Sequence, residues 1–155
     1  MAVRYEIVPV AANHIDELLA DPRPADVAEF LAASGEGPDV VLARAVAISP
    51  ECWAVLADGQ VLGIFGVAPI SMLSGRGAPW LVGTPILDRY ARGFIRLNRE
   101  FLPRALAGYS HLENWVDARN TKAINWLRWL GFTVHDPVPF GVAGLPFHRF
   151  DMRRE

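Results

Sequence analysis

The segment from Asp117 to Phe132 constrains the fold of this chain more than any other. An apolar, strand-like run ends at Asp117, and a helical period follows Asn120 and stops at Gly131. Asparagine is a favoured helix N-cap, and glycine commonly follows the last turn of a helix. The segment therefore predicts a strand end, a short capped helix and the start of a second strand.

The composition fits one globular domain. The chain has 155 residues, of which 52% are hydrophobic and 21% are charged, and its formal net charge is −2. This balance excludes a disordered chain and gives no general attraction to nucleic acid or to an anionic membrane. The first residues contain no apolar signal-peptide core, and no run approaches about 18 apolar residues. We therefore expect a single domain over residues 1–155, soluble and cytoplasmic.

Periodicity and turn residues predict a mixed α/β order of elements. Strands are expected over residues 4–10, 52–57, 61–68, 80–82, 111–117, 132–135 and 147–152. Helices are expected over residues 14–19, 24–35, 38–47 and 87–107, followed by the helix after Asn120. Asp58-Gly59 predicts a tight hairpin between the second and third strands, and residues 71–77 are expected to form a glycine-rich loop.

Three segments resemble the GNAT (Gcn5-related) N-acetyltransferase superfamily. The first is the spacing Asn-x-x-Ala, then Leu, then Gly-Phe within residues 120–132. The second is Trp-Leu-Val-Gly-Thr at 80–84 before the long helix, and the third is the Pro/Gly loop that leads into Phe147–Phe150. Together with Asn114–Asp117, the C-terminal half is most similar to the GNAT-like proteins of tailed bacteriophages, some of which are internal virion or assembly proteins.

The resemblance implies a GNAT-like acyl-CoA N-acyltransferase fold, in which helices flank a mixed, mostly antiparallel sheet of six to seven strands. It implies acetyl-CoA as co-substrate, no metal, and transfer of an acetyl group to an amine of a small molecule or protein by direct attack. The alternative is a catalytically silent phage virion or assembly protein that retains CoA binding, in the host cytoplasm or the virion. Expected partners are acyl-CoA and an amine acceptor, or phage structural proteins; a homodimer is compatible, and nucleic acid and membranes are not expected.

Eight residues are expected to contact the acyl-CoA. By the resemblance they are Leu81, Val82, Gly83, Thr84, Arg89, Asn120, Ala123 and Leu127. A helix N-terminus exposes N–H groups and about half a positive charge, which suits a pyrophosphate. The Thr84 hydroxyl either binds that phosphate or caps the helix. Arginines at 89, 92, 96 and 99 form a stripe that is expected to be a solvated basic face, with one or two of the first able to reach a phosphate.

Two positions depart from the family pattern. The loop Gly83-Thr84-Pro85 has one glycine and a proline where the family has a glycine-rich loop, and proline removes one backbone donor. Leu127 stands where many members carry a tyrosine that protonates the leaving thiolate. The usual general acid is therefore missing.

The expected catalytic residues are Glu113 and Asn114 on the strand before Asp117. Direct transfer needs a base for the amine and a donor for the carbonyl, which the backbone of the fourth strand commonly supplies in the family. Glu113, His111 and Asp117 lie on one face of their strand, and any of them can be the base. Asn114 and Asn120 are expected to position the pantetheine arm or order the strand–helix junction, and Asn120 is equally well explained as an N-cap.

Other chemistry finds little support in the sequence. The four histidines lack any metal-ligand spacing. Cys52 is the only cysteine, which excludes an internal disulfide, and it is best explained as a buried strand residue. No Ser-His-Asp signature and no nucleotide-binding P-loop occurs.

Overall fold

The computed structural model describes residues 2–154, which form strands and helices in mixed order. The strands are β1 (Tyr5–Pro9), β2 (Cys52–Ala57), β3 (Gln60–Ser71), β4 (Arg76–Gly83), β5 (His111–Asp117), β6 (Thr133–Val134), β7 (Val138–Phe140) and β8 (Leu145–Arg153). The helices are α1 (Ala12–Ala20), α2 (Pro24–Ser34), α3 (Pro38–Ile48), the 3₁₀ turn η1 (Pro85–Asp88), α4 (Ala91–Ala105) and α5 (Thr121–Trp129). The expected mixed α/β order is confirmed.

One mixed sheet runs through the molecule. Its strand order is β1-β2-β3-β4-β5-β8-β6, and β7 pairs with the edge of β8 that faces away from β5. Every neighbouring pair is antiparallel except β4 and β5. The sheet has eight strands rather than six to seven, because the Pro/Gly-rich connection over residues 136–146 contains the short strand β7.

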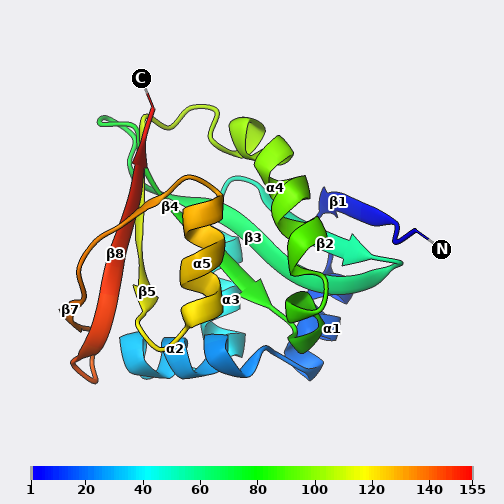
Figure 1. Cartoon of the computed structure of the whole chain (residues 1–155), viewed down its shortest axis with the longest axis horizontal. Coiled ribbons are helices and arrows are strands. Elements are labelled where there is room, and N and C mark those ends of the chain that lie inside the picture. Colours follow the sequence, from blue (N-terminus) through cyan, green and yellow to red (C-terminus); the bar gives the residue numbers. More distant parts are fainter. Residues whose placement is uncertain (1, 155) are drawn as a thin grey trace.

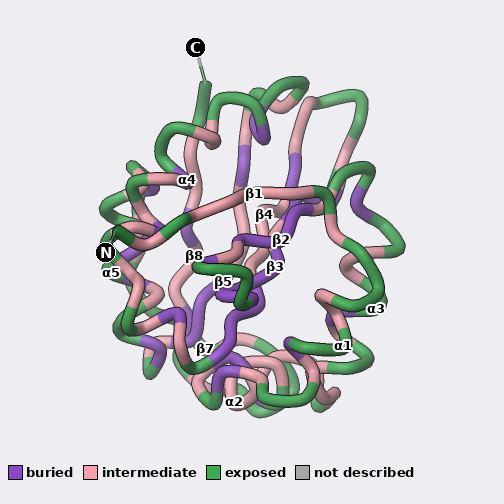
Figure 2. The backbone as a smooth tube through the Cα atoms, turned by 90° about the vertical axis from the view of Figure 1, so that its right-hand side faces the viewer, coloured by how far each residue is buried: buried purple, intermediate pink, exposed green. Residues whose placement is uncertain are grey.

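Helices cover both faces of the sheet and one end of it (Figure 1). On one face α1 and α3 bury Leu18 and Leu42 against Ile64 of β3. On the other face α4 and α5 lie side by side, and Phe94 and Trp126 pack with β2 and β3. Figure 2 shows that the buried segments are concentrated in the central strands, with the helices around them. Helix α2 lies across the ends of β4 and β5 (Figure 1), and its Phe30 packs against the layer formed by α1 and α3.

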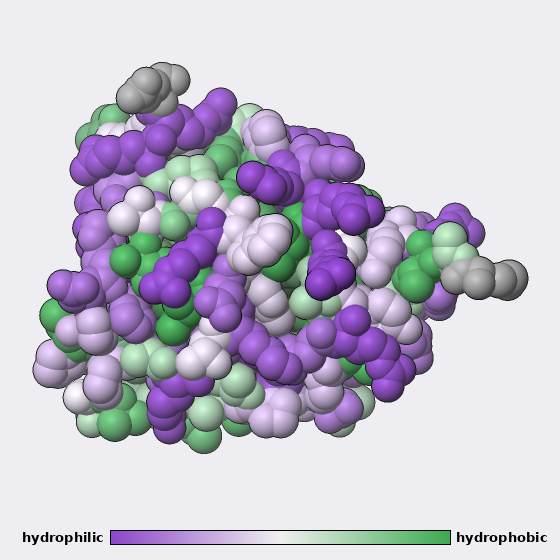
Figure 3. Space-filling model, viewed as in Figure 1, coloured by the Kyte–Doolittle hydropathy of each residue, from purple (hydrophilic) through white to green (hydrophobic). Residues whose placement is uncertain are grey.

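The longest helix is shorter than expected. Residues 85–88 form a 3₁₀ turn, Tyr90 has non-helical dihedral angles, and α4 then runs from Ala91 to Ala105. Pro85 at the first position of η1 fixes its dihedral angle there and has no N–H to extend the turn backward. Pro103 lies in the last turn of α4, and the helix ends two residues later. The predicted arginine stripe, 89, 92, 96 and 99, is exposed, and Figure 3 shows hydrophilic side chains over this helix.

The expected loop at 71–77 is also shorter in the structure. β3 extends to Ser71 and β4 begins at Arg76, because the two strands pair as far as Ser71 with Arg76, with a register shift after Pro69. The tight turn at Asp58-Gly59 is present between β2 and β3, and both residues have positive φ. No helix among the described residues is long and apolar enough to cross a membrane.

Candidate functional site

β4 and β5 form a wedge. They run parallel and pair only at their first residues, Arg76 with His111 and Gly77 with Leu112, and then diverge. Just beyond the paired residues, Asn114 Nδ2 donates a hydrogen bond to the carbonyl oxygen of Pro79 at 2.9 Å. Asn114 therefore holds the apex of the wedge, where a side chain replaces the next backbone bond between the strands.

A cavity of about 330 Å³ occupies this wedge and extends under α2, α4 and α5. Its lining is mostly aliphatic and aromatic, with Trp80, Leu81 and Val82 on β4 and Trp115 and Val116 on β5. The polar side chains among its lining residues are Asp26, Glu29, Asn98, Asn114 and Asn120, besides the tryptophans. A largely apolar cavity with a few convergent polar groups is typical of a small-molecule site.

The backbone of Leu81 points into the wedge. Alternate residues of a strand direct their N–H and C=O groups to the same neighbour. On β4, Gly77 pairs with β5, the Pro79 carbonyl accepts from Asn114, and Gly83 bonds to α2. Leu81 belongs to the same series, and neither β5 nor a side chain of the described residues pairs with it. Its N–H and C=O are therefore available to a ligand in the cavity.

Helix α2 closes the wide end of the wedge through two carboxylates. Asp26 Oδ2 accepts the N–H of Gly83, the last residue of β4, at 2.8 Å. Glu29 Oε1 accepts the N–H of Asp117, the last residue of β5, at 2.8 Å. Spaced by three residues, the two acids lie on one side of the helix and reach the two separated strand ends. The helix thereby satisfies backbone donors that the diverging strands cannot satisfy for each other.

Four side chains at this end, Arg23, Asp26, Asp88 and Asn120, form what we call the mouth cluster. Arg23 Nη1 donates to Asp26 Oδ1 and to Asn120 Oδ1, each at 3.0 Å, and Arg23 Nε donates to Asp88 Oδ1 at 3.1 Å. The Arg23 guanidinium also lies 4.8 Å from the ring centroid of Trp126. Arg23 is only 4% exposed and Asp26 only 6%, so this is a buried and well-paired charge group.

The two carboxylates of α2 have perturbed acidities. Burial raises the pKa of the Glu29 carboxyl to about 7, and the charges of Asp26 and Asp117 act in the same direction against the hydrogen bonds from Asp117 and Asn120. Burial also raises the pKa of Asp26, which the Arg23 charge opposes. Glu29 Oε1 makes both of the hydrogen bonds that Glu29 accepts from described residues. Its Oε2 is left for a ligand.

Among the solved structures that superpose on this chain are several acetyltransferases. Ard1 from Thermoplasma volcanium superposes with a TM-score of 0.70 at 13% identity, over 97% of this chain and 98% of its own. The spermidine N-acetyltransferase of Vibrio cholerae, solved with CoA and spermine, gives 0.67 at 12% identity, over 96% and 95%. The IAA acetyltransferase of Bacillus cereus ATCC 14579 gives 0.63 at 15% identity, over 99% and 100%. This chain has the GNAT acetyltransferase fold. Neither a protein-family model nor a curated protein sequence matches it.

Within the GNAT fold, most of the residues expected to contact acyl-CoA lie at the wedge. Leu81, Val82, Ala123 and Leu127 line the cavity. Asn120 lines it as well, and its side chain bonds to Arg23, Asp26 and Glu29. Asn120 is the N-cap residue of α5 by position, but its side chain makes no capping hydrogen bond. Its side-chain amide instead forms hydrogen bonds to Arg23, at the N-cap of α2, and to Asp26 and Glu29 of α2.

The segment 83–85 at the end of β4 offers no backbone donor to the diphosphate that the resemblance places there. The N–H of Gly83 is bonded to Asp26, the N–H of Thr84 donates to the Leu62 carbonyl at 2.9 Å, and Pro85 has no N–H. The Thr84 hydroxyl is buried and donates to the Val61 carbonyl at 2.8 Å, so it neither caps η1 nor faces a ligand. Arg89 is exposed and does not line the cavity.

Glu113 lies outside the cavity, on the opposite face of β5 from Asn114. It pairs with Arg76 and with Arg149, in the latter case at 3.3 Å. His111 lies on the same face and bonds through Nε2 to Asp151 at 3.1 Å. Asp117 is buried at the strand end, where burial acts to raise its pKa but the hydrogen bonds from Arg119 outweigh it and lower it. The structure thus brings Asn114 and Asn120 to the wedge and leaves Glu113 and His111 out.

Sequence reasoning missed the carboxylates of α2. Asp26 and Glu29 are three residues apart on a helix that is otherwise mostly apolar, and Pro24 marks its first turn. Two acids on one side of an apolar helix are a sign of a paired or functional site, since carboxylates are rarely buried without partners. That signal was present, but the partner strand ends are distant in sequence. Among residues 2–154 no group of three or more His, Cys, Asp or Glu side chains is arranged to hold a metal ion.

Proposed function

We propose that this protein is an N-acyltransferase that holds an acyl thioester in the wedge between β4 and β5 and transfers the acyl group to an amine. The observation that carries the proposal is the wedge itself, an apolar cavity of about 330 Å³ between two parallel strands that separate after two residue pairs. The GNAT acetyltransferase fold supports it, and acetyl-CoA is the donor that the sequence resemblance implies.

Two groups of the chain supply the chemistry in this proposal. The free N–H of Leu81 donates to the carbonyl oxygen of the acyl group, where negative charge develops during attack. Glu29 accepts the proton that the amine loses, and a pKa of about 7 suits a base that works near neutral pH. The amine nitrogen bonds to the carbonyl carbon as the carbon–sulfur bond breaks. The thiolate then leaves and is protonated by solvent or by Glu29.

Thiol release tests the proposal directly. Acetyl-CoA and S-acetylpantetheine are each offered with a panel of amines, including spermidine and a peptide with a free N-terminus, and free thiol is measured over time. We expect release above the uncatalysed rate for at least one donor and acceptor, and a loss of about a hundredfold in Glu29→Gln. No release with any pair, from protein shown to be folded, would exclude the enzyme.

A second candidate is a catalytically silent GNAT-fold protein of a phage virion or assembly pathway, as the C-terminal resemblance implies. Two observations favour it. Leu127 lines the cavity, and no Tyr, Ser, Thr, Cys or His is among the lining residues to protonate a leaving thiolate. The N–H groups of Gly83 and Thr84, at the end of β4, are also bonded within the protein.

Mass spectrometry of purified virions separates the two candidates, if the source is a phage. The silent protein is expected at a fixed copy number per particle, with no thiol release in the assay above. Turnover that disappears in Glu29→Gln would reject the silent reading, whether or not the protein is packaged.

A further inference from the structure

We propose that Asp26 occupies the anion position of this site, so that the wedge selects its thioester donor by the neutral pantetheine arm and discriminates against a diphosphate. The inference rests on the proposed N-acyltransferase function and names the class of donor: an S-acyl thioester of a pantetheine-type arm without a nucleotide diphosphate. Asp26 is a specificity-determining residue in this proposal.

Gly83 carries the geometric argument. Both of its backbone groups are bonded to the first turn of α2: its N–H donates to Asp26 Oδ2 at 2.8 Å, and its carbonyl accepts the N–H of Arg23 at 2.8 Å. A Cβ at this glycine would lie 2.8 Å from Leu87 Cδ2 and 3.4 Å from both Arg23 Cδ and Asp26 Oδ2. The glycine therefore lets α2 approach the end of β4 closely, and neither backbone group of Gly83 is left to bind a phosphate.

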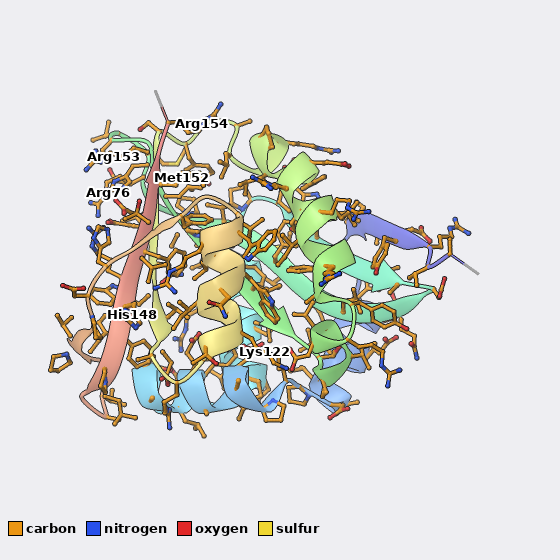
Figure 4. The ribbon with its side chains drawn as sticks, viewed as in Figure 1. Arg76, Lys122, His148, Met152, Arg153 and Arg154 are labelled. Carbon is orange, nitrogen blue, oxygen red and sulfur yellow. The ribbon has the colours of Figure 1, made fainter. Side chains whose placement is uncertain are left out.

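Charge and burial make the same point. The guanidinium of Arg23 already contacts two carboxylates, Asp26 and Asp88, and the second of these also pairs with Lys122 Nζ at 3.1 Å. Figure 4 shows Lys122 at the end of α5 that lies beside α2. A bound diphosphate would add negative charge next to two carboxylates whose cations are already paired, and Asp26 would have to leave a buried hydrogen bond. A ligand whose diphosphate would unpair the buried charges of Arg23 and Asp26 therefore binds less tightly than one without a diphosphate.

A neutral arm meets none of these obstacles. Along β4 the wedge offers the free N–H and C=O of Leu81 and a lining of apolar side chains. The amide groups of a pantetheine arm can pair with that backbone as an added strand would. The wedge can then select a donor by its pantetheine arm without a hydrogen bond from the charged side chains of the mouth cluster.

Calorimetric titration of three ligands against the full chain tests the inference. The ligands are acetyl-CoA, S-acetylpantetheine and 3′-phospho-ADP, which together separate the arm from the nucleotide. The proteins are the wild type, Asp26→Asn, and Asp39→Asn as a matched control. Asp39 is also an acid in the first turn of a helix, but it is exposed on α3.

In the wild type we expect S-acetylpantetheine to bind at least as tightly as acetyl-CoA and 3′-phospho-ADP not to bind. In Asp26→Asn we expect acetyl-CoA to gain tenfold or more in affinity while the affinity for S-acetylpantetheine stays the same, and in Asp39→Asn we expect neither to change. The comparison of ligands on the wild type needs no variant to fold.

Wild-type binding of acetyl-CoA ten times or more tighter than S-acetylpantetheine would overturn the role of Asp26 and leave the N-acyltransferase intact. Equal gains of both thioesters in Asp26→Asn would overturn it too, since the carboxylate would then not discriminate. If neither thioester binds the wild type or Asp26→Asn, the proposed function fails and the donor class fails with it.

Discussion

Two carboxylate clusters lie on either side of the strand β5, and they use the same residue types in opposite ways. The mouth cluster and its neighbour Glu29 lie where α2 meets the ends of β4 and β5. Burial there raises the pKa of Glu29 to about 7. The second, which we call the outer cluster, consists of Glu113, Arg149, Asp151, His111 and His135 on the face of β5 and β8 away from α4 and α5. There, burial acts to raise the pKa of Asp151, but hydrogen bonds from the two histidines and the Arg149 charge outweigh it and lower it.

The difference shows why a carboxylate cannot be assigned a role from its strand position alone. Glu113 has two arginine partners and no access to the cavity. Glu29 lines the cavity and accepts hydrogen bonds from Asp117 and Asn120, and no cation among residues 2–154 is bonded to it. A base that must exchange protons with a bound amine needs the second environment. Figure 4 shows Arg76, one of the two cations that pair with Glu113, near the C-terminal end of β8 and apart from Lys122 at the lower end of α5.

The largest difference between the two clusters is expected in the free energy of unfolding when the main cation of each, Arg23 or Arg149, is removed. Arg23→Ala is expected to lower the free energy of unfolding by about 3–5 kcal/mol, because it leaves the Asp26 carboxylate buried without its partner. Arg149→Ala in the outer cluster is expected to lower it by less than about 1 kcal/mol, since its side chain is 34% exposed. Urea denaturation at pH 7.5 measures both. Equal losses would mean that the mouth cluster is no more buried in solution than the outer one.

The pH dependence of stability should reveal Glu29 next. Its folded-state pKa of about 7 lies above the ordinary value of 4.5, so the folded protein holds a proton that the unfolded chain has lost between these values. The free energy of unfolding should therefore fall as the pH rises from 4.5 to 7, by up to about 3 kcal/mol from this group. Denaturation at pH 5 and 7.5 should show this fall in the wild type and a smaller one in Glu29→Gln. An equal fall in stability in the wild type and in Glu29→Gln would mean that another titratable group causes it.

Activity should distinguish the two glutamates by about a hundredfold. Glu29→Gln is expected to lower kcat for thiol release by that factor, which corresponds to about 2.7 kcal/mol, because it removes the base. The wild-type rate should rise with pH through about 7 as Glu29 loses its proton, and Glu29→Gln should lose this rise. Glu113→Gln serves as the matched control and should keep the rate and its profile. A greater loss in Glu113→Gln would restore the residue expected from the sequence.

The smallest effect is expected in the outer cluster. The pKa of Asp151 is lowered in the folded protein, so its contribution to stability is present above the ordinary value of 3.8 and is lost as the pH falls through the folded value. Asp151→Asn should be less stable than the wild type at pH 7, and the difference should shrink below about pH 4. Denaturation against pH checks this, with the exposed Asp39→Asn as control. A difference that is constant with pH would point to lost packing instead.

The sequence predicted much of the fold because its signals are local. The alternation in residues 52–57 and 61–68 with Asp58-Gly59 between them gives a hairpin, and Gly131 ends the helix that follows Asn120. The predicted ends of the long helix, residues 87 and 107, were wrong, since α4 runs from Ala91 to Ala105. Its start depends on the 3₁₀ turn at Pro85 and the break at Tyr90, and these depend on how the chain leaves β4. The strand β7 was missed, since it forms by pairing with β8 rather than by its own pattern.

For the site, the sequence indicated strands and a helix that line the cavity, but not the two acids of α2 that line it as well. Leu81, Val82, Ala123 and Leu127 could be placed because they follow a spacing in the chain. Asp26 and Glu29 meet Gly83 and Asp117 across 57 and 88 residues of sequence, and no local pattern encodes such a meeting.

The sequence by itself determined the mixed α/β order, the α5 segment and the absence of a hydroxyl at Leu127, because each depends on residue type and spacing along one stretch of chain. Only the tertiary structure decided which carboxylates face the wedge and which backbone donors near it are already bonded. The physical reason is that a carboxylate's acidity and availability depend on burial and on the hydrogen-bond donors around it, and folding brings those from α2, β4 and β5 together.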